Sequence, residues 1–306
     1  MTIKNNARIC LMVSCAVMVI ALLMSLFVGF RFGVDFAGGL QLSYPMNESF
    51  EQADVAAALK ASGISGHTIS KAGSNGDILQ IRLPSVGGDA EIQALKASLD
   101  SALGEKYPNV DVAAATAQTI GPATSTSTLV NALVGVLLAG VFVLIFLLLR
   151  VDLNSGMTVA FGMIHDVLLM LGLTVILRLQ VNAPFAAAIV AVAGYSLIST
   201  LAILASIRKS KKLPDAAKLS DDEIVNISVK SGLGHTAAVL VAALILLVVL
   251  CIFAAGSVRA FVLPVILGIL CSAYSTNMIS GYVWAFLEER RKQAKSSKTG
   301  RKAKKA

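Results

Sequence analysis

The chain has 306 residues, of which 56% are hydrophobic and only 14% are charged. Soluble domains carry about 25% charged residues, so this composition excludes an ordinary water-soluble enzyme and indicates an integral membrane protein. The net charge is +8, and the basic residues concentrate in one loop and in the C-terminal tail, with few aromatic residues among them. That distribution suits membrane topology and contact with anionic membrane lipid, and we expect no nucleic-acid partner.

Six apolar segments are long enough to cross a bilayer, which needs about 20 residues per helix. The first segment is too long for a signal peptide and lacks a small-residue cleavage site, so we interpret it as an uncleaved anchor. In chain order the six segments are Ile9–Phe30, Leu129–Leu149, Met157–Leu177, Pro184–Ile207, Thr236–Ala255 and Ala260–Leu287.

The basic residues also predict the orientation of these segments. With the N-terminus inside, 18 of the 26 Lys and Arg residues fall on the cytoplasmic side, and the short outside loops hold only Arg178 and Arg259. We therefore predict a multi-pass protein of the cell (cytoplasmic) membrane with both termini cytoplasmic. The expected division is a first transmembrane helix at 1–30, an extracytoplasmic domain at 31–126, a five-helix bundle at 127–287 and a basic cytoplasmic tail at 288–306. We expect this tail to be disordered.

The predicted extracytoplasmic domain has ordinary soluble composition, with ten acidic and six basic residues. Its pattern reads strand, helix, strand, strand, helix, strand, which is the ferredoxin-like βαββαβ order. The expected fold class is therefore an α-helical bundle of six transmembrane helices with one α+β domain between the first two. The expected elements are strands at 39–44, 67–73, 77–83 and 110–120 and helices at 49–63 and 88–107.

No catalytic or metal-binding pattern stands out in the sequence. The four cysteines lie inside apolar runs without CxxC spacing, so we predict neither a disulfide framework nor a metal site. We expect no cofactor and no enzymatic activity, and we interpret the extracytoplasmic domain as a binding or lever module. Small residues at four-residue spacing predict close helix packing at three places: Gly135 and Ala139, Ala187 and Ala191, and Gly268, Ser272 and Thr276.

Several short motifs resemble those of one family when taken in chain order. "FGVDFAGG" follows the first segment, "TIGP" precedes the second, "IHDV" lies in the third, "GYSL" lies in the fourth and "SVRAF" precedes the sixth. Together with the architecture, they resemble the SecD/SecF family of protein-export membrane proteins, within the resistance-nodulation-division superfamily. The single domain of about 95 residues is similar to that of the SecF type.

The resemblance implies a function as an accessory subunit of the Sec protein-export translocase. Such a subunit pairs with SecD beside the SecYEG translocon and promotes late steps in the translocation of preproteins, driven by the proton gradient. Two alternatives stay open: a degenerate scaffold without proton coupling, and a small-molecule exporter of the same superfamily.

The chain departs from the family pattern at its expected proton-relay positions. Ile198 and Ser199 stand where the family has Asn and Asp, and His235 stands where it has Arg. The resemblance therefore leaves proton coupling in question, because a serine cannot carry a charge. His235 can titrate, or it can be an interfacial histidine.

His165 and Asp166 are the remaining ionisable pair in an apolar segment, where each ionisable group costs a few kcal/mol or more. Adjacent helical residues point about 100° apart, so we do not expect the two side chains to pair with each other. We expect Asp166 to meet the polar residues of the fourth segment. These candidates are Tyr195, Ser196, Ser199 and Thr200. Asp166 then either handles protons or fixes helix packing.

The glycine-rich motif after the first segment joins a helix to the predicted domain. Its glycines permit positive φ values, and its aspartate can accept hydrogen bonds within the turn. We interpret the motif as a hinge or anchor, with direct contact to substrate or SecD as the alternative. Its residues are Gly33, Asp35, Phe36, Gly38 and Gly39.

Overall fold

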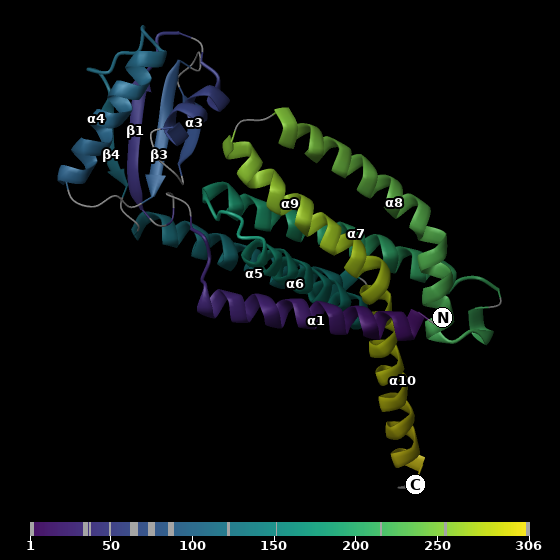
Figure 1. The fold of residues 1–306 in the computed structure, drawn as a ribbon. Helices are drawn as coiled ribbons and strands as arrows, with labels where there is room; N and C mark the ends of the chain where they lie inside the picture. Colours follow the sequence, from purple (N-terminus) through teal and green to yellow (C-terminus); the bar gives the residue numbers. More distant parts are fainter. Residues whose placement is uncertain are drawn as a thin grey trace.

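The computed structural model has a helical bundle with a small α/β domain at one end, and the N-terminus lies at the other end (Figure 1). It describes residues 3–303 except 33–35, 37, 49, 62–66, 73–76, 85–88, 121–122, 151, 215 and 254–255. Gly33 and Asp35 of the glycine-rich motif lie outside the described residues.

Long apolar helices form the bundle. Among the described residues, five stretches have the length and hydropathy needed to cross a membrane, and α5 is a further helix of 28 residues. The helices are α1 (Ile3–Phe27), α5 (Ala123–Arg150), α6 (Leu153–Ile176), α7 (Ala183–Ser210), α8 (Asp221–Phe253), α9 (Gly256–Ser275) and α10 (Gly281–Ala303), with a 3₁₀ turn at Ala216–Lys218 and a π-helical turn, η2, at Thr276–Ser280.

Polar residues set where these helices begin. The Asp152 carboxylate accepts from the backbone N–H and the hydroxyl of Ser155 and so caps α6. Ser220 and Glu223 cap α8 reciprocally: the Glu223 carboxylate accepts from the backbone N–H and the hydroxyl of Ser220, and the Ser220 hydroxyl accepts from the Glu223 N–H. The helix that carries the fifth apolar segment therefore begins at Asp221, well before the segment's predicted start at Thr236.

The C-terminal part of the chain also differs from expectation. The single helix predicted at 260–287 is divided by η2, and α10 then leaves the bundle at a wide angle (Figure 1). The tail is helical to Ala303, so the prediction of disorder is wrong. Glu288 anchors the base of α10, since it accepts from Asn154 at 2.6 Å and pairs with Lys211 at 3.5 Å.

The α/β domain is a four-stranded sheet covered by two helices. The strands run in the order β2-β3-β1-β4, and every neighbouring pair is antiparallel. Along β1, alternate residues are buried, so Leu40, Leu42 and Tyr44 face the core while their neighbours are less buried. The elements are β1 (Gly39–Pro45), α3 (Gln52–Ala61), β2 (Thr68–Ala72), β3 (Ile78–Pro84), α4 (Asp89–Lys106) and β4 (Thr116–Ile120).

The last strand is shorter than the predicted 110–120. The Asp111 carboxylate accepts from the backbone N–H of Ala114 at 3.0 Å, and the N–H of Val110 donates to the Tyr107 carbonyl. These bonds fold 107–114 into turns, because an aspartate side chain competes with strand pairing for local backbone donors.

Small residues let some helices approach closely and leave others open. A Cβ on Gly268 of α9 would overlap the side chain of Val192 on α7, which confirms close packing there. A Cβ on Gly135 would meet nothing within 4 Å, while Ala187 and Ala191 are exposed on α7. Among the residues that the structure describes, the small faces predicted on α5 and α7 therefore have no closely packed neighbour.

We predict that Gly268→Val destabilises the bundle more than Gly135→Val, by about 1–3 kcal/mol, because only the first side chain forces helices apart. Both changes have the same effect on helix propensity, so their difference reports packing. Detergent unfolding followed by fluorescence of the buried Trp284, the single tryptophan, measures it. Equal losses of stability in the two variants would contradict the close α7–α9 contact.

Candidate functional site

A cluster of polar side chains lies between the central helices, and all of its members are at most 8% exposed. We call it the buried polar cluster. Helix α6 contributes two residues, α7 three, α9 one and η2 two. They are His165 and Asp166, Ser196, Ser199 and Thr200, Ser272, and Thr276 and Ser280.

Asp166 is at the centre of this cluster and is fully buried near the middle of α6. The Ser196 hydroxyl donates to its Oδ2 at 2.6 Å, and His165 Nδ1 lies 3.1 Å from its Oδ1. Both carboxyl oxygens are thus hydrogen-bonded, which a buried carboxyl requires to offset its lost hydration. The bond to Ser196 also joins α6 to α7.

The expectation that His165 and Asp166 do not pair is wrong. Their Cα–Cβ bonds diverge by about 100° around the helix, but the imidazole ring turns so that Nδ1 reaches the neighbouring carboxylate. His165 also stacks on Phe161, with ring centroids 5.8 Å apart. Phe161 covers one face of the imidazole ring, and the Nδ1 edge of the ring faces the Asp166 carboxyl.

Ser199 links the cluster to α9 and η2. Its hydroxyl oxygen lies 3.1 Å from the hydroxyl oxygen of Ser272, and the Thr276 hydroxyl donates to it at 3.2 Å. The Ser199 hydroxyl also donates to the Tyr195 carbonyl at 2.9 Å. A hydroxyl at position 199 therefore connects three helical segments by neutral hydrogen bonds, without carrying charge.

Two polar atoms in the cluster have unused hydrogen-bonding capacity. Among the described residues, neither Thr200 Oγ1 nor His165 Nε2 has a hydrogen-bond partner. Gly162 makes space beside Thr200, because a Cβ there would lie 3.1 Å from Thr200 Oγ1 and 3.5 Å from Ser280 Oγ. An unsatisfied buried group costs about 1–3 kcal/mol, so the cluster is polar beyond what its own bonds satisfy.

The structure brings together some of the predicted residues but not all of them. Ser196 meets Asp166 as expected, while Ser199 and Thr200 lie in the same cluster without a hydrogen bond to its carboxylate. Tyr195 instead packs partly buried against an apolar cluster of α8 and α9. His235 is exposed on α8 and lies outside the buried polar cluster.

Sequence reasoning interpreted Ser272 and Thr276 only as small packing residues and did not single out Ser280. Gly268, Ser272, Thr276 and Ser280 recur every four residues, so they share one helical face. Three hydroxyls on the face of a membrane helix could have indicated a polar contact as well as close packing. The π-helical turn was not predicted, although such turns are frequent at functional sites.

The glycine-rich motif is anchored to the bundle through Phe36. Phe36 is 6% exposed and packs in an apolar cluster that includes Met163 and Val167, which flank Asp166 on α6. Gly38 follows with φ of +74°, a value that favours glycine, before β1 begins at Gly39. Phe36 thus ties the start of the α/β domain to the helix that carries Asp166.

The segment between α1 and Phe36 is also tied to the α6–α7 connection. The Arg178 guanidinium donates to the Gly29 carbonyl at 2.7 Å, and the backbone N–H of Val181 donates to the Arg31 carbonyl at 2.9 Å. Phe32 and Val181 form an isolated parallel bridge. The segment between α1 and Phe36 and the α6–α7 connection are therefore held against each other at this end of the bundle.

The cluster offers one carboxyl, one imidazole and six hydroxyls. No group of three His, Cys, Asp or Glu residues suited to a metal ion occurs in the part of the chain that the structure describes. All four cysteines are free thiols. Each hydroxyl in the cluster can both donate and accept hydrogen bonds.

Comparison with known proteins gives a consistent family. The family described as Protein export membrane protein SecD/SecF, C-terminal, matches residues 101–290. The protein translocase subunit SecF of Desulfurispirillum indicum is 26% identical, over 91% of this chain and 88% of its own length. That of Thermodesulfovibrio yellowstonii is 28% identical, over 82% of this chain and 81% of its own length.

Solved structures share the fold. A crystal structure of SecDF in the super-membrane-facing form matches 97% of this chain with a TM-score of 0.75 and 24% identity. A crystal structure of SecDF from Thermus thermophilus, a translocon-associated membrane protein, matches 94% with a TM-score of 0.66 and 22% identity. The match covers 40% and 38% of those two chains, so this chain spans about two fifths of each.

The family match covers more than half of the chain, and the fold match covers nearly all of it. Long apolar helices and a protein-export family together make this a multi-pass membrane protein of protein transport. The chain belongs to the SecD/SecF family of protein-export membrane proteins.

Proposed function

We propose that this chain is a SecF-type accessory subunit of the Sec translocase, which acts with SecD to promote late, proton-gradient-driven steps of protein translocation. Its partners are then SecD, the SecYEG translocon and the translocating preprotein. The family membership and the SecF relatives, each matched over most of its length, support the subunit type.

One observation supports the coupling part of the proposal: the anchor of the α/β domain belongs to an apolar cluster that takes in residues on both sides of Asp166 on α6. Phe36 shares this cluster with Met163, Val167 and Met170 of α6. A change in the hydrogen bonds of Asp166 alters how α6 packs on α7, and this change reaches the domain through Phe36. Proton binding at one place is thereby linked to movement at another.

The topology that this function requires follows from charge and length. We propose six membrane spans, with α5 as the second, both termini in the cytoplasm and a ferredoxin-like domain outside. The excess of Lys and Arg in the 208–230 loop and the tail supports this orientation. The basic α10 would then lie at the cytoplasmic surface, where anionic membrane lipid attracts each Lys or Arg by about 1 kcal/mol.

The SecD contact is proposed on an exposed face of α7. Ala187, Ala191 and Gly194 lie along this face, and nothing within 4 Å would meet a Cβ on Gly194. Small residues allow a second helix to approach closely, and lipid alone does not require them. This face is on the same helix as Ser196, so a partner there would lie one helix away from Asp166.

A scaffold without proton coupling is the second candidate, and two observations favour it. Ser199 makes only neutral hydrogen bonds, and His235 is exposed on α8, apart from the buried cluster. Asp166 would then serve only to pin α6 to α7. The two candidates differ in one measurable property, which is the dependence of preprotein release on the proton gradient.

We predict that Asp166→Asn abolishes the gradient-dependent part of preprotein release while leaving the complex assembled. Asparagine keeps the shape and can still accept from Ser196, but it cannot bind and release a proton. The measurement is the release rate of a late-stage preprotein from membranes that contain the chain and SecD, with and without a proton gradient.

Asp54→Asn serves as the matched control, because Asp54 is 60% exposed and its ion pair with Lys106 is a surface pair of small energetic value. Release that ignores the gradient in the native protein would favour the scaffold. Failure of Asp166→Asn to assemble with SecD would assign Asp166 a packing role.

We predict that Ala191→Phe weakens association with SecD, whereas Ala242→Phe, an exposed change on α8, does not. A phenyl ring on a close-packed face costs about 1–3 kcal/mol, which is a roughly fivefold or greater loss of affinity. Copurification of SecD in mild detergent measures this loss. Equal recovery of SecD with both variants would place the contact elsewhere.

A further inference from the structure

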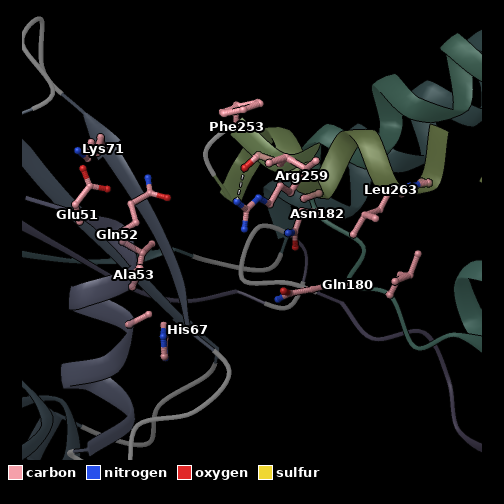
Figure 2. Close-up of a pocket in the computed structure, with 16 residues that line it drawn as sticks. Glu51, Gln52, Ala53, His67, Lys71, Gln180, Asn182, Phe253, Arg259 and Leu263 are labelled. Carbon is pink, nitrogen blue, oxygen red and sulfur yellow. Dashed lines mark hydrogen bonds between the residues drawn. The ribbon is translucent and has the colours of Figure 1, made fainter. Parts of the chain in front are cut away.

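Two hollows lie at opposite ends of the bundle. The larger one, about 800 Å³, lies beside the contact between β2 and the start of α9 (Figure 2). Glu51 and Lys71 line its domain wall and Arg259 lines its bundle wall, so this lining selects no single ligand charge. The smaller one, about 580 Å³, lies where α6 begins and α10 leaves the bundle. Both volumes are in the range of ligand-binding sites, about 300–1,000 Å³.

The smaller hollow, which we call the α6–α10 pocket, is lined by basic and apolar side chains. Asp152 is the one acid among the described lining residues, and both of its carboxylate oxygens already accept hydrogen bonds from Ser155. The pocket therefore presents two guanidinium groups to a ligand. Its lining residues are Asp152, Leu153, Asn154 and Met157 on the α6 side and Leu287, Arg290 and Arg291 on the α10 side.

The two arginines keep positive charge that acids of the described chain do not balance. Arg290 forms no ion pair with a described residue, and its guanidinium lies over the Phe286 ring at 4.9 Å. Arg291 pairs with Glu288 at 3.5 Å, but Glu288 also pairs with Lys211 at 3.5 Å, so one carboxylate faces two cations. A phosphate group would complement this charge, because its oxygens match the planar fork of a guanidinium.

The pocket lies at the depth of lipid headgroups. Helix α6 has 24 residues and is therefore about 36 Å long, whereas the hydrocarbon core of a bilayer is about 30 Å thick. The first residues of α6, which line the pocket, thus extend beyond the hydrocarbon. The basic α10 leaves the bundle beside them at a wide angle, as a helix that follows the membrane surface does (Figure 1).

An apolar stripe on α6 leads from the pocket toward the middle of the membrane. Four exposed apolar side chains share one face of this helix, within about 80° of each other at 100° per residue. The stripe is about 22 Å long, which is more than the thickness of one leaflet, about 15 Å. It can therefore contact a whole acyl chain. Its residues are Leu153, Phe161, Ile164 and Leu168.

We propose that the α6–α10 pocket is a binding site for one anionic phospholipid, with the lipid phosphate at Arg290 and Arg291 and an acyl chain along the α6 stripe. Charge complementarity selects the headgroup, and the continuous apolar face selects a lipid over a free anion. The proposal goes beyond export, since it requires only that the chain spans a membrane. A lipid held there would fill the angle between α6 and α10.

The first test measures lipid binding by the purified full chain in neutral detergent. Dioleoyl phosphatidylglycerol is titrated in, and native mass spectrometry counts the bound lipid. We expect Arg290→Gln to weaken binding of the first lipid several-fold. Lys292→Gln removes the same charge from the same helix outside the pocket lining, so it should change binding little. Equal binding by Arg290→Gln and the native chain, or equal losses in the two variants, would overturn the proposal.

A second arm separates a lipid from a free anion. Inorganic phosphate, added at constant ionic strength to the lipid-bound chain, should not displace phosphatidylglycerol, because it cannot use the apolar stripe. Displacement by phosphate at concentrations comparable to those of the lipid would show a simple anion site and would overturn the proposal.

A third arm locates the lipid in vesicles of equal dioleoyl phosphatidylglycerol and dioleoyl phosphatidylcholine. A photo-crosslinking amino acid replaces Leu153 in the pocket or Val190, which is exposed on α7 outside it. Lipid attached at position 153 should favour phosphatidylglycerol several-fold, while lipid attached at position 190 should follow the composition of the vesicle. The same lipid ratio at both positions would overturn the assignment to this pocket.

Discussion

The hydrogen bond from the Ser196 hydroxyl to the Asp166 carboxylate is the interaction on which the rest of the bundle depends. A carboxyl in an apolar bundle is tolerated only when its oxygens are satisfied, because the lost hydration costs several kcal/mol. This requirement sets the rotation of α6 and its distance from α7. Gly162, which leaves space beside Thr200, and Gly268, which admits Val192, then allow α6, α7 and α9 to close around the polar side chains.

The buried polar cluster holds more polar groups than helix packing alone requires. A packing role requires only that Asp166 be satisfied, and Ser196 and His165 do this. The cluster goes further: among the described residues Thr200 Oγ1 and His165 Nε2 are unpartnered, and the π-helical η2 interrupts the regular helix beside them. Spare hydrogen-bonding groups and irregular backbone are expected where hydrogen bonds rearrange during function.

The α/β domain is linked to the helix that carries Asp166 at one end of the bundle. Phe36 packs in an apolar cluster that includes residues of α6, and the carbonyl of Gly29 is held by Arg178 just after the same helix ends. The linker between α1 and the domain is therefore fastened to α6 by apolar packing and by a hydrogen bond. If α6 moved without this linker, the apolar packing and the hydrogen bond would both have to break. A shift of α6 is therefore expected to move the linker as well.

The sequence by itself determined the elements and the class of the protein. Apolar length predicts the helices, period-two burial in β1 predicts a strand with one core face, and the motifs predict the family. Asp166 could be singled out from the sequence because an acid in an apolar run is costly wherever the chain folds. The extension of α8 was also readable, since Ser220 and Glu223 form a local capping box.

Only the tertiary structure decided which polar residues meet. Ser196 and Tyr195 are adjacent in the sequence, but one turns to Asp166 and the other packs against α8 and α9. The hydroxyls of Ser272 and Thr276 join the cluster from about 70 residues further along the chain. Such contacts depend on the rotation and crossing of whole helices, which are set by the packing of all their side chains together and not by local propensity.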